Sequence, residues 1–158
     1  MAQKYGRTWW GQQWLNALEK IDYSNRLPRG RNYASKGAVK AIEYKKNVIH
    51  ARVAGTRPSP YKIKMLVPLF TPDEQNQLLG SVLNNRILLS RLLNRELPAG
   101  LLKLAEAQGI QVFPKSWHDI EMRCSCPDWA VPCKHIASVV YTIAESIDEN
   151  LFLVFELH

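Results

Sequence analysis

The sequence lacks any long hydrophobic run. Its longest unbroken apolar stretch is Leu151 to Phe155, far shorter than the roughly 20 residues that a membrane-spanning helix requires. Residues 1–10 also lack the apolar region of a secretory signal peptide. We therefore expect a soluble protein located in the cytoplasm. With 158 residues, 46% of them hydrophobic, the chain corresponds to about one domain, which excludes a large multidomain enzyme.

Two familiar nucleotide-binding motifs are also absent. The chain contains neither Gly-x-x-x-x-Gly-Lys-Ser/Thr nor Gly-x-Gly-x-x-Gly, whose glycines let backbone amides approach phosphates. Any ATPase connected with this protein must therefore be a partner. Asp119 and Glu121 share one face of a predicted strand, but no nucleophile or cleft accompanies them. We predict no catalytic residue and a protein that is not an enzyme.

Acidic residues are scarce in one part of the chain. The protein has 21 Lys and Arg against 14 Asp and Glu, a formal net charge of +7. The segment from Asp22 to Lys64 holds eleven bases and two acids, so the whole basic excess lies there. Such a concentration predicts contact with nucleic acid. The candidate phosphate-binding residues are Arg26, Arg29, Arg31, Lys36, Arg52, Arg57, Lys62 and Lys64.

The chain is expected to begin with a helix and a loop. Trp10, Trp14 and Leu18 repeat at helical spacing after Thr8, a suitable N-cap, and large aromatic residues of this kind usually pack in the core. Residues 22–37 are rich in turn formers and show no hydrophobic periodicity, so we expect them to form a basic loop.

Three strand-like runs follow and predict a small antiparallel β-meander. They are residues 39–44, 48–54 and 61–67. Because side chains alternate across a strand, Arg52 is expected on the face opposite its apolar neighbours, and Lys62 and Lys64 likewise. One face of the sheet is therefore predicted to be basic.

The basic segment also contains tyrosines that are candidate stacking platforms for unpaired bases. They are Tyr23, Tyr33, Tyr44 and Tyr61. A solvated sheet face backed by core tyrosines is the alternative explanation of the same pattern. No recognition helix with Arg, Asn or Gln at base-reading spacing is found, so sequence-specific reading is not expected.

Residues 71–109 are expected to be helical. Thr71 followed three residues later by Glu74 is typical of a capping box. The helix that starts there is expected to break at residues 84–85, where two asparagines stand together. Another helix is predicted over residues 98–108, ended by a glycine.

All three cysteines lie within ten residues. Cys124 and Cys126 are followed, after six residues, by Cys133 and then, two positions on, by His135. Three thiolates and one imidazole complete a four-coordinate shell, so the pattern predicts one structural Zn²⁺ with no position left open for water. An odd number of cysteines in a cytoplasmic chain argues against a disulfide framework.

Each ligand pair needs its own backbone geometry. Cys124 and Cys126 share a face if residues 121–126 form a strand. Cys133 and His135 are about 200° apart on a regular helix, so we expect Cys133 just before a helix and His135 in its first turn. The apolar stripe that follows is helical and completes a zinc-stapled ββα finger.

Two basic residues flank the predicted ligands. Zinc with three thiolates carries a net charge of −1, which Arg123 and Lys134 can offset. Solvated side chains are the alternative explanation for both.

The cysteine spacing resembles the SWIM zinc finger family, whose signature is Cys-x-Cys, a variable gap, then Cys-x-His. The four predicted ligands occupy its four positions. The resemblance to bacterial members extends over most of the chain and includes Trp9-Trp10, Arg29-Gly30-Arg31, Tyr33 to Gly37 and Gly55 to Tyr61. It implies binding of DNA or protein, often together with a Swi/Snf-type helicase ATPase.

These patterns predict a compact α+β protein with a helix and basic meander in residues 1–70, helices in 71–109 and the zinc finger with a C-terminal helix in 110–158. The leading hypothesis is a non-catalytic nucleic-acid-binding protein, with DNA favoured over RNA, that works alongside a helicase-type ATPase. The alternative is a protein adaptor whose finger or Trp9-Trp10 region docks on a Swi/Snf-type ATPase or on the transcription machinery. No membrane partner is expected.

Overall fold

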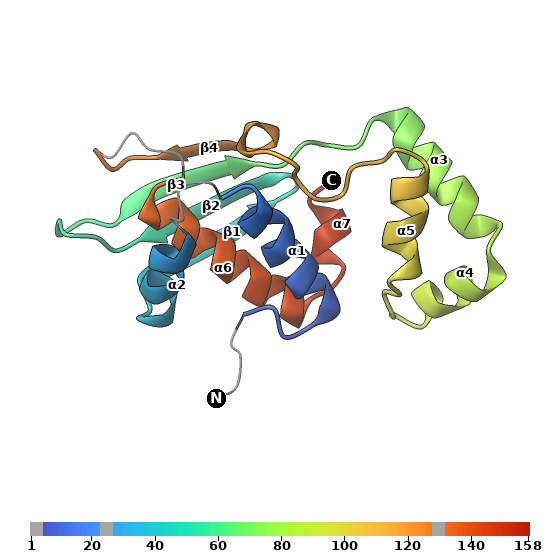
Figure 1. Ribbon diagram of the computed structural model, residues 1–158, viewed down its shortest axis with the longest axis horizontal. Helices are drawn as coiled ribbons and strands as arrows, with labels where there is room; N and C mark the ends of the chain where they lie inside the picture. The colour runs from blue at the N-terminus through green and yellow to red at the C-terminus, as the bar shows by residue number, and fades with distance from the viewer. Residues whose placement is uncertain (1–4, 23–26, 128–131) are drawn as a thin grey trace.

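The computed structural model describes residues 5–22, 27–127 and 132–158, and Figure 1 shows how their elements are arranged. The α+β class expected from the sequence is confirmed. Within this part of the chain the elements are α1 (Trp9–Lys20), α2 (Leu27–Ser35), β1 (Val39–Lys45), β2 (Val48–Val53), β3 (Tyr61–Leu66), α3 (Pro72–Leu83), α4 (Arg86–Leu93), α5 (Gly100–Ala107), the 3₁₀ helix η1 (Trp117–Asp119), β4 (Glu121–Cys124), α6 (Lys134–Glu149) and α7 (Leu153–Glu156).

The four strands form one antiparallel sheet in the order β1-β2-β3-β4. The predicted meander is confirmed as β1 to β3. β4 returns to the sheet after helices α3 to α5 and pairs with β3, so that Cys124 lies opposite Ile63. The finger therefore shares the sheet of the meander, and Cys124 ends the edge strand of that sheet, with Cys126 just beyond it.

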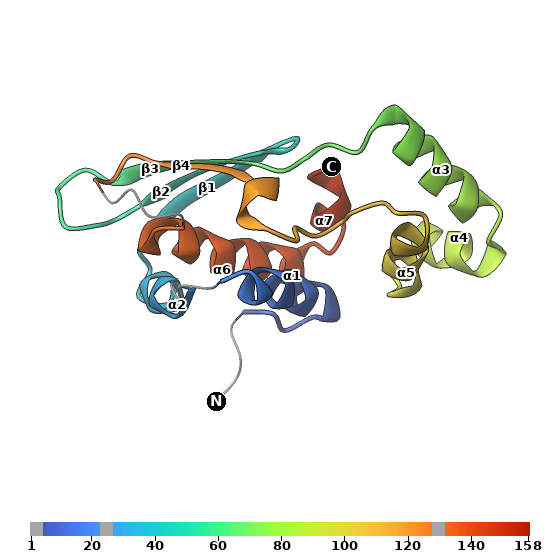
Figure 2. The ribbon, with the colours of Figure 1, turned by 45° about the horizontal axis from the view of Figure 1, so that its top comes forward.

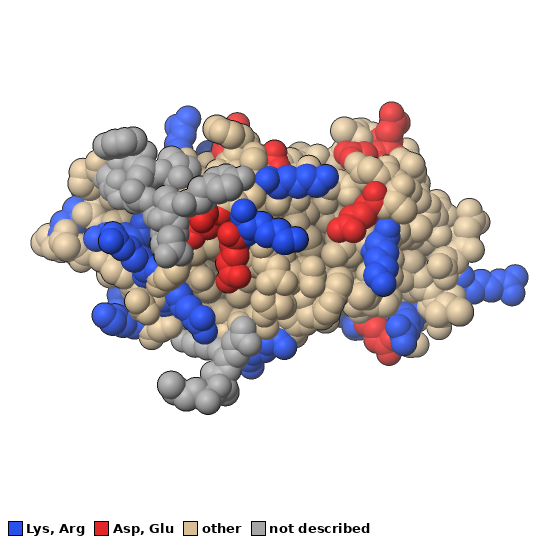
Figure 3. Space-filling view, viewed as in Figure 1, with Lys and Arg blue, Asp and Glu red and all other residues tan. Residues whose placement is uncertain are grey.

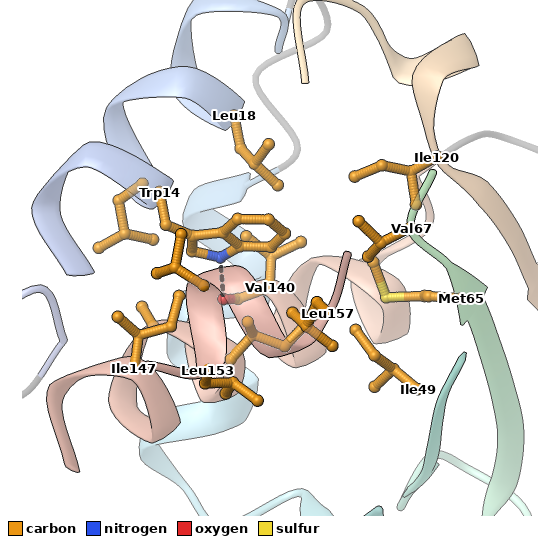
Figure 4. Packing of buried hydrophobic residues seen from close by; sticks show 14 of the residues in the cluster. Trp14, Leu18, Ile49, Met65, Val67, Ile120, Val140, Ile147, Leu153 and Leu157 are labelled. Carbon is orange, nitrogen blue, oxygen red and sulfur yellow. Dashed lines mark hydrogen bonds between the residues drawn. The ribbon is translucent and has the colours of Figure 1, made fainter. Parts of the chain in front are cut away.

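Helix α6 lies in the middle of three layers. Figure 2 shows the sheet on one side of α6 and the pair α1 and α2 on the other. Ten residues of α6 are buried, because this helix has neighbours on both sides. In Figure 4 the indole of Trp14 lies over α6 and donates from Nε1 to the carbonyl oxygen of Val140 at 2.9 Å.

The N-terminal helix is held to the end of α6 by hydrogen bonds. Thr8 is the N-cap of α1, as predicted, and accepts from the backbone N–H of Gly11. Its hydroxyl and backbone N–H both donate to the carboxylate of Asp148, at 2.6 and 2.9 Å. Trp10 and Trp14 are buried in the core as expected, whereas Trp9 is 44% exposed.

The expectation of a loop over residues 22–37 is wrong, because Leu27–Ser35 forms helix α2. Only Leu27, Gly30 and Ala34 of this helix are buried, which is too few apolar side chains to produce a hydrophobic periodicity. Gly30 lies against α6, and a Cβ there would be 2.3 Å from the Cβ of Ala137. Its function is therefore a close helix contact and not a turn.

Helices α3, α4 and α5 form a lobe that stands beside the layered body in both ribbon views. Thr71 begins α3 with the predicted capping box. As predicted, the helix ends at the two asparagines, which separate α3 from α4. The indole of Trp10 donates to the carbonyl oxygen of Leu97 at 2.8 Å. The ring nitrogens of His158 lie 2.6 Å from the carbonyl oxygen of Pro68 and 2.8 Å from that of Val112, so the segments entering and leaving the lobe are joined.

The described residues contain α-helices of four to sixteen residues. None of them combines the necessary length with sufficient apolar character.

Candidate metal centre and basic surfaces

The three cysteines and His135 come together where β4 approaches the start of α6. Cys124 is the last residue of β4, Cys133 is the N-cap of α6, and His135 lies in the first turn of that helix. These positions confirm the geometry predicted for Cys133 and His135. Ser125 fixes the chain between the first two cysteines, because its backbone N–H donates to the carbonyl oxygen of Lys62 and its hydroxyl accepts from the Lys62 N–H.

The ligand atoms are close enough to share one metal ion. The sulfur atoms of Cys124, Cys126 and Cys133 and a ring nitrogen of His135 all lie within 4.8 Å of one another. Nδ1 of His135 is 3.8 Å from Sγ of Cys124 and 3.9 Å from Sγ of Cys133. Zinc bond lengths of about 2.3 Å to sulfur and about 2.0 Å to nitrogen give a tetrahedral sulfur–nitrogen separation of about 3.5 Å. The donor set and its spacing therefore fit zinc bound through Nδ1.

The thiols also change one another's pKa. A hydrogen bond with the side chain of Cys124 lowers the pKa of Cys133 to about 5, and the backbone N–H of Ile136 contributes to this. The same pairing, together with burial, raises the pKa of Cys124. Negative charge is thus favoured on the sulfur that caps α6, where the helix dipole stabilises it as well.

Aromatic rings surround His135, which is only 3% exposed. The Tyr61 ring lies 4.5 Å from the imidazole, centroid to centroid, and the Tyr33 ring lies 5.8 Å away. A Cβ at Gly55 would lie 2.2 Å from the Tyr61 ring and 3.1 Å from Nε2 of His135, so only glycine allows the backbone to pass this close. Nε2 is buried and has no hydrogen-bond partner among the described residues.

The two cations predicted beside the ligands lie in different places. Lys134 is on the zinc side, with its Nζ 5.4 Å from the centroid of the Tyr33 ring. Arg123 precedes Cys124 on β4, so its side chain points to the opposite face of the sheet. Arg57 also lies near the ligands, a position that the sequence analysis did not predict. Its guanidinium is 4.3 Å from the centroid of the Tyr61 ring.

The candidate phosphate-binding residues fall into two groups. Arg52, Lys62 and Lys64 are exposed on the sheet face that no described helix covers. The second group comprises Arg29 and Arg31 on α2, Lys36 just after it, and Arg57 between β2 and β3. Of these, Arg29 lines a pocket together with Cys126 and His135, and Arg57 lies over the Tyr61 ring. In Figure 3 basic side chains lie at the end of the molecule that carries α2, and others are spread over the rest of that face. Arg26 lies outside the described residues.

The uncovered face, which we call the open sheet face, carries more basic residues than the sequence analysis assigned to it. Its cations are Lys45, Arg52, Lys62, Lys64 and Arg123, and its carboxylates are Glu43 and Glu121. A bulge between Val39 and Ala41 leaves Lys40 without a partner strand residue. This extra residue is exposed because the bulge releases it from the alternation of its neighbours.

The tyrosines of the meander do not lie on the open sheet face. Tyr61 is buried against His135, and Tyr44 donates from its hydroxyl to Ser146 of α6 at 2.8 Å. Burial raises the pKa of Tyr44 to about 12. The expectation that these two residues are stacking platforms is therefore wrong, and the alternative of core tyrosines is confirmed for them. Tyr23 lies outside the described residues.

Asp119 and Glu121 do not form an acid/base pair on one strand. Asp119 ends the 3₁₀ helix η1, and its carboxylate accepts from the side chain of Gln111 and the backbone N–H groups of Lys115 and Ser116. These hydrogen bonds, that of Lys115 foremost, lower the pKa of Asp119. Its function in this position is to cap a turn that leads into β4.

Comparison with known proteins supports the metal centre. The family model of the SWIM zinc finger matches residues 119–144. The chain is also similar to the uncharacterized protein Rv2102 of Mycobacterium tuberculosis (strain ATCC 25618 / H37Rv), with 36% identity over 148 residues. That match covers 94% of this chain and 53% of the relative, so the chain spans about half the length of the curated protein it matches. No solved structure matches the chain.

Proposed function

We propose that the protein is a non-catalytic binder of nucleic acid in which residues 119–144, which match the SWIM zinc finger, form a zinc-binding domain. One structural Zn²⁺ is held by Cys124, Cys126, Cys133 and His135 and joins the end of β4 to the start of α6. All four ligands come from the protein, so no coordination position remains for a substrate or a catalytic water. The metal stabilises the edge of the sheet and takes no part in a reaction.

The open sheet face carries this proposal. Strand pairing places Arg52 directly beside Lys62, and Lys64 beside Arg123. Like charges in adjacent strand positions destabilise a sheet by a few tenths of a kcal/mol or more per pair. None of these four cations forms an ion pair with a described residue. A surface with this arrangement is stabilised by a polyanion, and the phosphates of nucleic acid supply one.

The face supports backbone contact and not base reading. Its side chains reach phosphates from a gently hollowed surface between β1, β2 and β3, and Tyr44 and Tyr61 of the meander are turned into the core. We therefore propose that the protein binds nucleic acid without sequence preference, and DNA more than RNA. We also propose that it acts alongside a Swi/Snf-type helicase ATPase, which supplies the nucleotide hydrolysis.

The test is fluorescence anisotropy of the zinc-loaded protein with labelled single- and double-stranded DNA and RNA over a range of salt concentrations. Affinity should fall steeply as salt rises, because each phosphate contact releases a counterion. The double variant Lys62→Gln/Lys64→Gln should reduce the slope of log K against log salt by about 1.4–1.8.

A matched control removes the same charge elsewhere. Arg86 and Lys103 are exposed on the helical lobe, and Arg86→Gln/Lys103→Gln should leave the salt slope unchanged. Equal losses in the two double variants would mean that net charge, and not the open sheet face, determines binding. Absence of binding at low salt would exclude the proposal.

A protein adaptor is the second candidate, and the helical lobe favours it. Large apolar side chains are exposed along α3 and α4, with Ile87 and Leu93 each 76% exposed. Exposed apolar residues that gather on one element mark protein contacts more often than chance. Binding to a helicase ATPase that is insensitive to salt and lost in Ile87→Ser would support this function over the first.

A further inference from the structure

A cavity lies where the two segments that connect the helical lobe meet the layered body. It has a volume of about 240 Å³. Its walls come from both connecting segments, residues 67–70 and 111–114, and from α1, α6 and α7. In Figure 4, Trp14, Val67 and Leu157 lie around this region of the core although they come from distant parts of the chain. None of the four zinc ligands lines the cavity, so it is separate from the metal centre.

Most of the wall is apolar and lies deep in the molecule. Trp14, Ile147 and Leu157 line the cavity, and each of them is at most 4% exposed. A cavity of about 150 Å³ with apolar walls already takes up benzene. The volume of about 240 Å³ is therefore sufficient for a compound of two fused rings such as indole.

Aromatic rings form part of this wall. Besides Trp14 they are Phe70 and Phe113, and His158 is stacked on Phe70 with the ring centroids 4.2 Å apart. Burial is the main cause of the lowered pKa of His158, so its imidazole is neutral at neutral pH. Aromatic rings pack against other rings and attract cations through their faces.

The charged residues of the wall are both acidic. They are Glu74 and Asp119, and no Lys or Arg of the described residues lines the cavity. Both are half-buried, whereas the apolar residues around Trp14 are buried, so the two carboxylates lie towards the outer end of the cavity. Their position is opposite in sign to the basic open sheet face.

Hydrogen bonds hold both carboxylates without neutralising them. Glu74 accepts from the backbone N–H of Thr71 at 2.9 Å. Asp119 accepts from the side chain of Gln111 and from two backbone N–H groups. All of these donors are uncharged, and neither carboxylate forms an ion pair with a described residue. Two negative charges are therefore available to a cation at the outer end of the cavity.

We infer that this cavity binds a small aromatic ammonium compound, with its rings among the apolar side chains and its ammonium group near Glu74 and Asp119. Burial of the rings supplies affinity, and the carboxylates select the positive charge. The inference goes beyond the proposed function and does not depend on it, because no charged residue of the open sheet face lines the cavity.

The experiment titrates compounds that share the same indole rings into the zinc-loaded protein. Tryptamine carries a positive charge, 3-methylindole is neutral and indole-3-propionate carries a negative charge. Binding is followed by the methyl resonances of Ile147 and Val154, which line the cavity and report its occupation directly. Tryptamine should bind about two- to fivefold more tightly than 3-methylindole, as expected for a partly exposed ion pair, and indole-3-propionate should bind most weakly.

A conservative variant tests the selection of charge. Glu74→Gln removes one carboxylate and retains the capping box, because glutamine also accepts from the backbone N–H of Thr71. It should weaken the binding of tryptamine by about two- to fivefold and leave that of 3-methylindole unchanged. Asp73→Asn is the matched control, because Asp73 is exposed in the same helical turn and does not line the cavity. Far-ultraviolet circular dichroism of both variants verifies that α3 is retained.

Three results would overturn the inference. The absence of methyl shifts with all of the compounds would mean that the cavity is closed to ligands. Equal affinity for the three compounds would mean that the cavity takes apolar rings without selecting a cation. Equal weakening of tryptamine binding by Glu74→Gln and Asp73→Asn would mean that only the general charge of α3 matters.

Discussion

Replacing Gly30 by alanine is expected to destabilise the protein, although this change normally strengthens a helix. Gly30 is buried in α2 where that helix packs on α6. An added Cβ would lie 2.3 Å from the Cβ of Ala137, 2.4 Å from its carbonyl carbon and 2.6 Å from the backbone nitrogen of Ser138. Two of these atoms are backbone in a fully buried part of α6. Since carbon atoms pack at about 3.5–4.0 Å, α2 must move outward by roughly 1 Å.

The expected loss follows from two opposing effects. Alanine is favoured over glycine inside a helix by about 1 kcal/mol, whereas overpacking a close contact costs about 1–3 kcal/mol. Because the added carbon meets backbone atoms that cannot rotate away, the overpacking penalty should lie in the upper half of its range. The free energy of unfolding should therefore fall by about 1–2 kcal/mol, which lowers Tm by about 2–8 °C in a domain of this size.

Gly80 provides a matched control, since it lies in α3 with no atom within 4 Å of its ideal Cβ. Gly80→Ala should raise the free energy of unfolding by up to about 1 kcal/mol. Urea unfolding followed by far-ultraviolet circular dichroism measures both variants. A Gly30→Ala protein that unfolds at the same or a higher urea concentration than the wild type would refute the close approach of α2 to α6.

Three further changes test the metal centre, the core and the response to acid. Cys133→Ser should reduce bound zinc, measured by atomic absorption, to well below one ion per chain and speed hydrogen exchange at the start of α6; unchanged zinc content and folding would contradict the ligand assignment. Trp14→Phe should lower the free energy of unfolding in urea by about 1–3 kcal/mol, because a carbonyl of α6 loses its indole donor, whereas Trp9→Phe should change it by less than about 0.5 kcal/mol. A hydrogen bond from the Lys115 backbone is the main cause of the lowered pKa of Asp119. The Asp119 carboxylate therefore stabilises the folded state fully at a pH above its unfolded pKa near 3.8. This stabilisation is lost as the pH falls through the lower pKa of the folded state. Asp119→Asn should accordingly show a smaller decrease of the urea midpoint between about pH 5 and pH 2, and an unchanged decrease would contradict this assignment.

The sequence predicted the metal centre and the helix starts because their signals are local. Cys133 and His135 are only two residues apart, so the geometry of one helical turn decides where each must lie. Thr8 and Thr71 cap helices through side-chain contacts within three or four residues, and such contacts depend little on the rest of the fold.

Features that depend on packing between distant segments were not predicted. Helix α2 buries a glycine and two other small or apolar positions against α6, and a face without large side chains has no hydrophobic signature in the sequence. The tyrosines were misplaced for a related reason. A strand pattern shows that Tyr61 and Lys62 lie on opposite faces, but it does not show which face the helices cover.

The zinc centre and the open sheet face are opposite sides of the same strand. Cys124 and Arg123 are neighbours on β4, so the sulfur points towards α6 while the guanidinium points to the uncovered surface beside Lys64. β4 has only four residues and lies at the edge of the sheet, where strand pairing on one side alone holds it weakly. Zinc ties the end of this strand to α6. A metal that touches no phosphate thereby fixes the position of a cation in the proposed nucleic-acid surface, which explains why the finger and the basic sheet occur together in one fold.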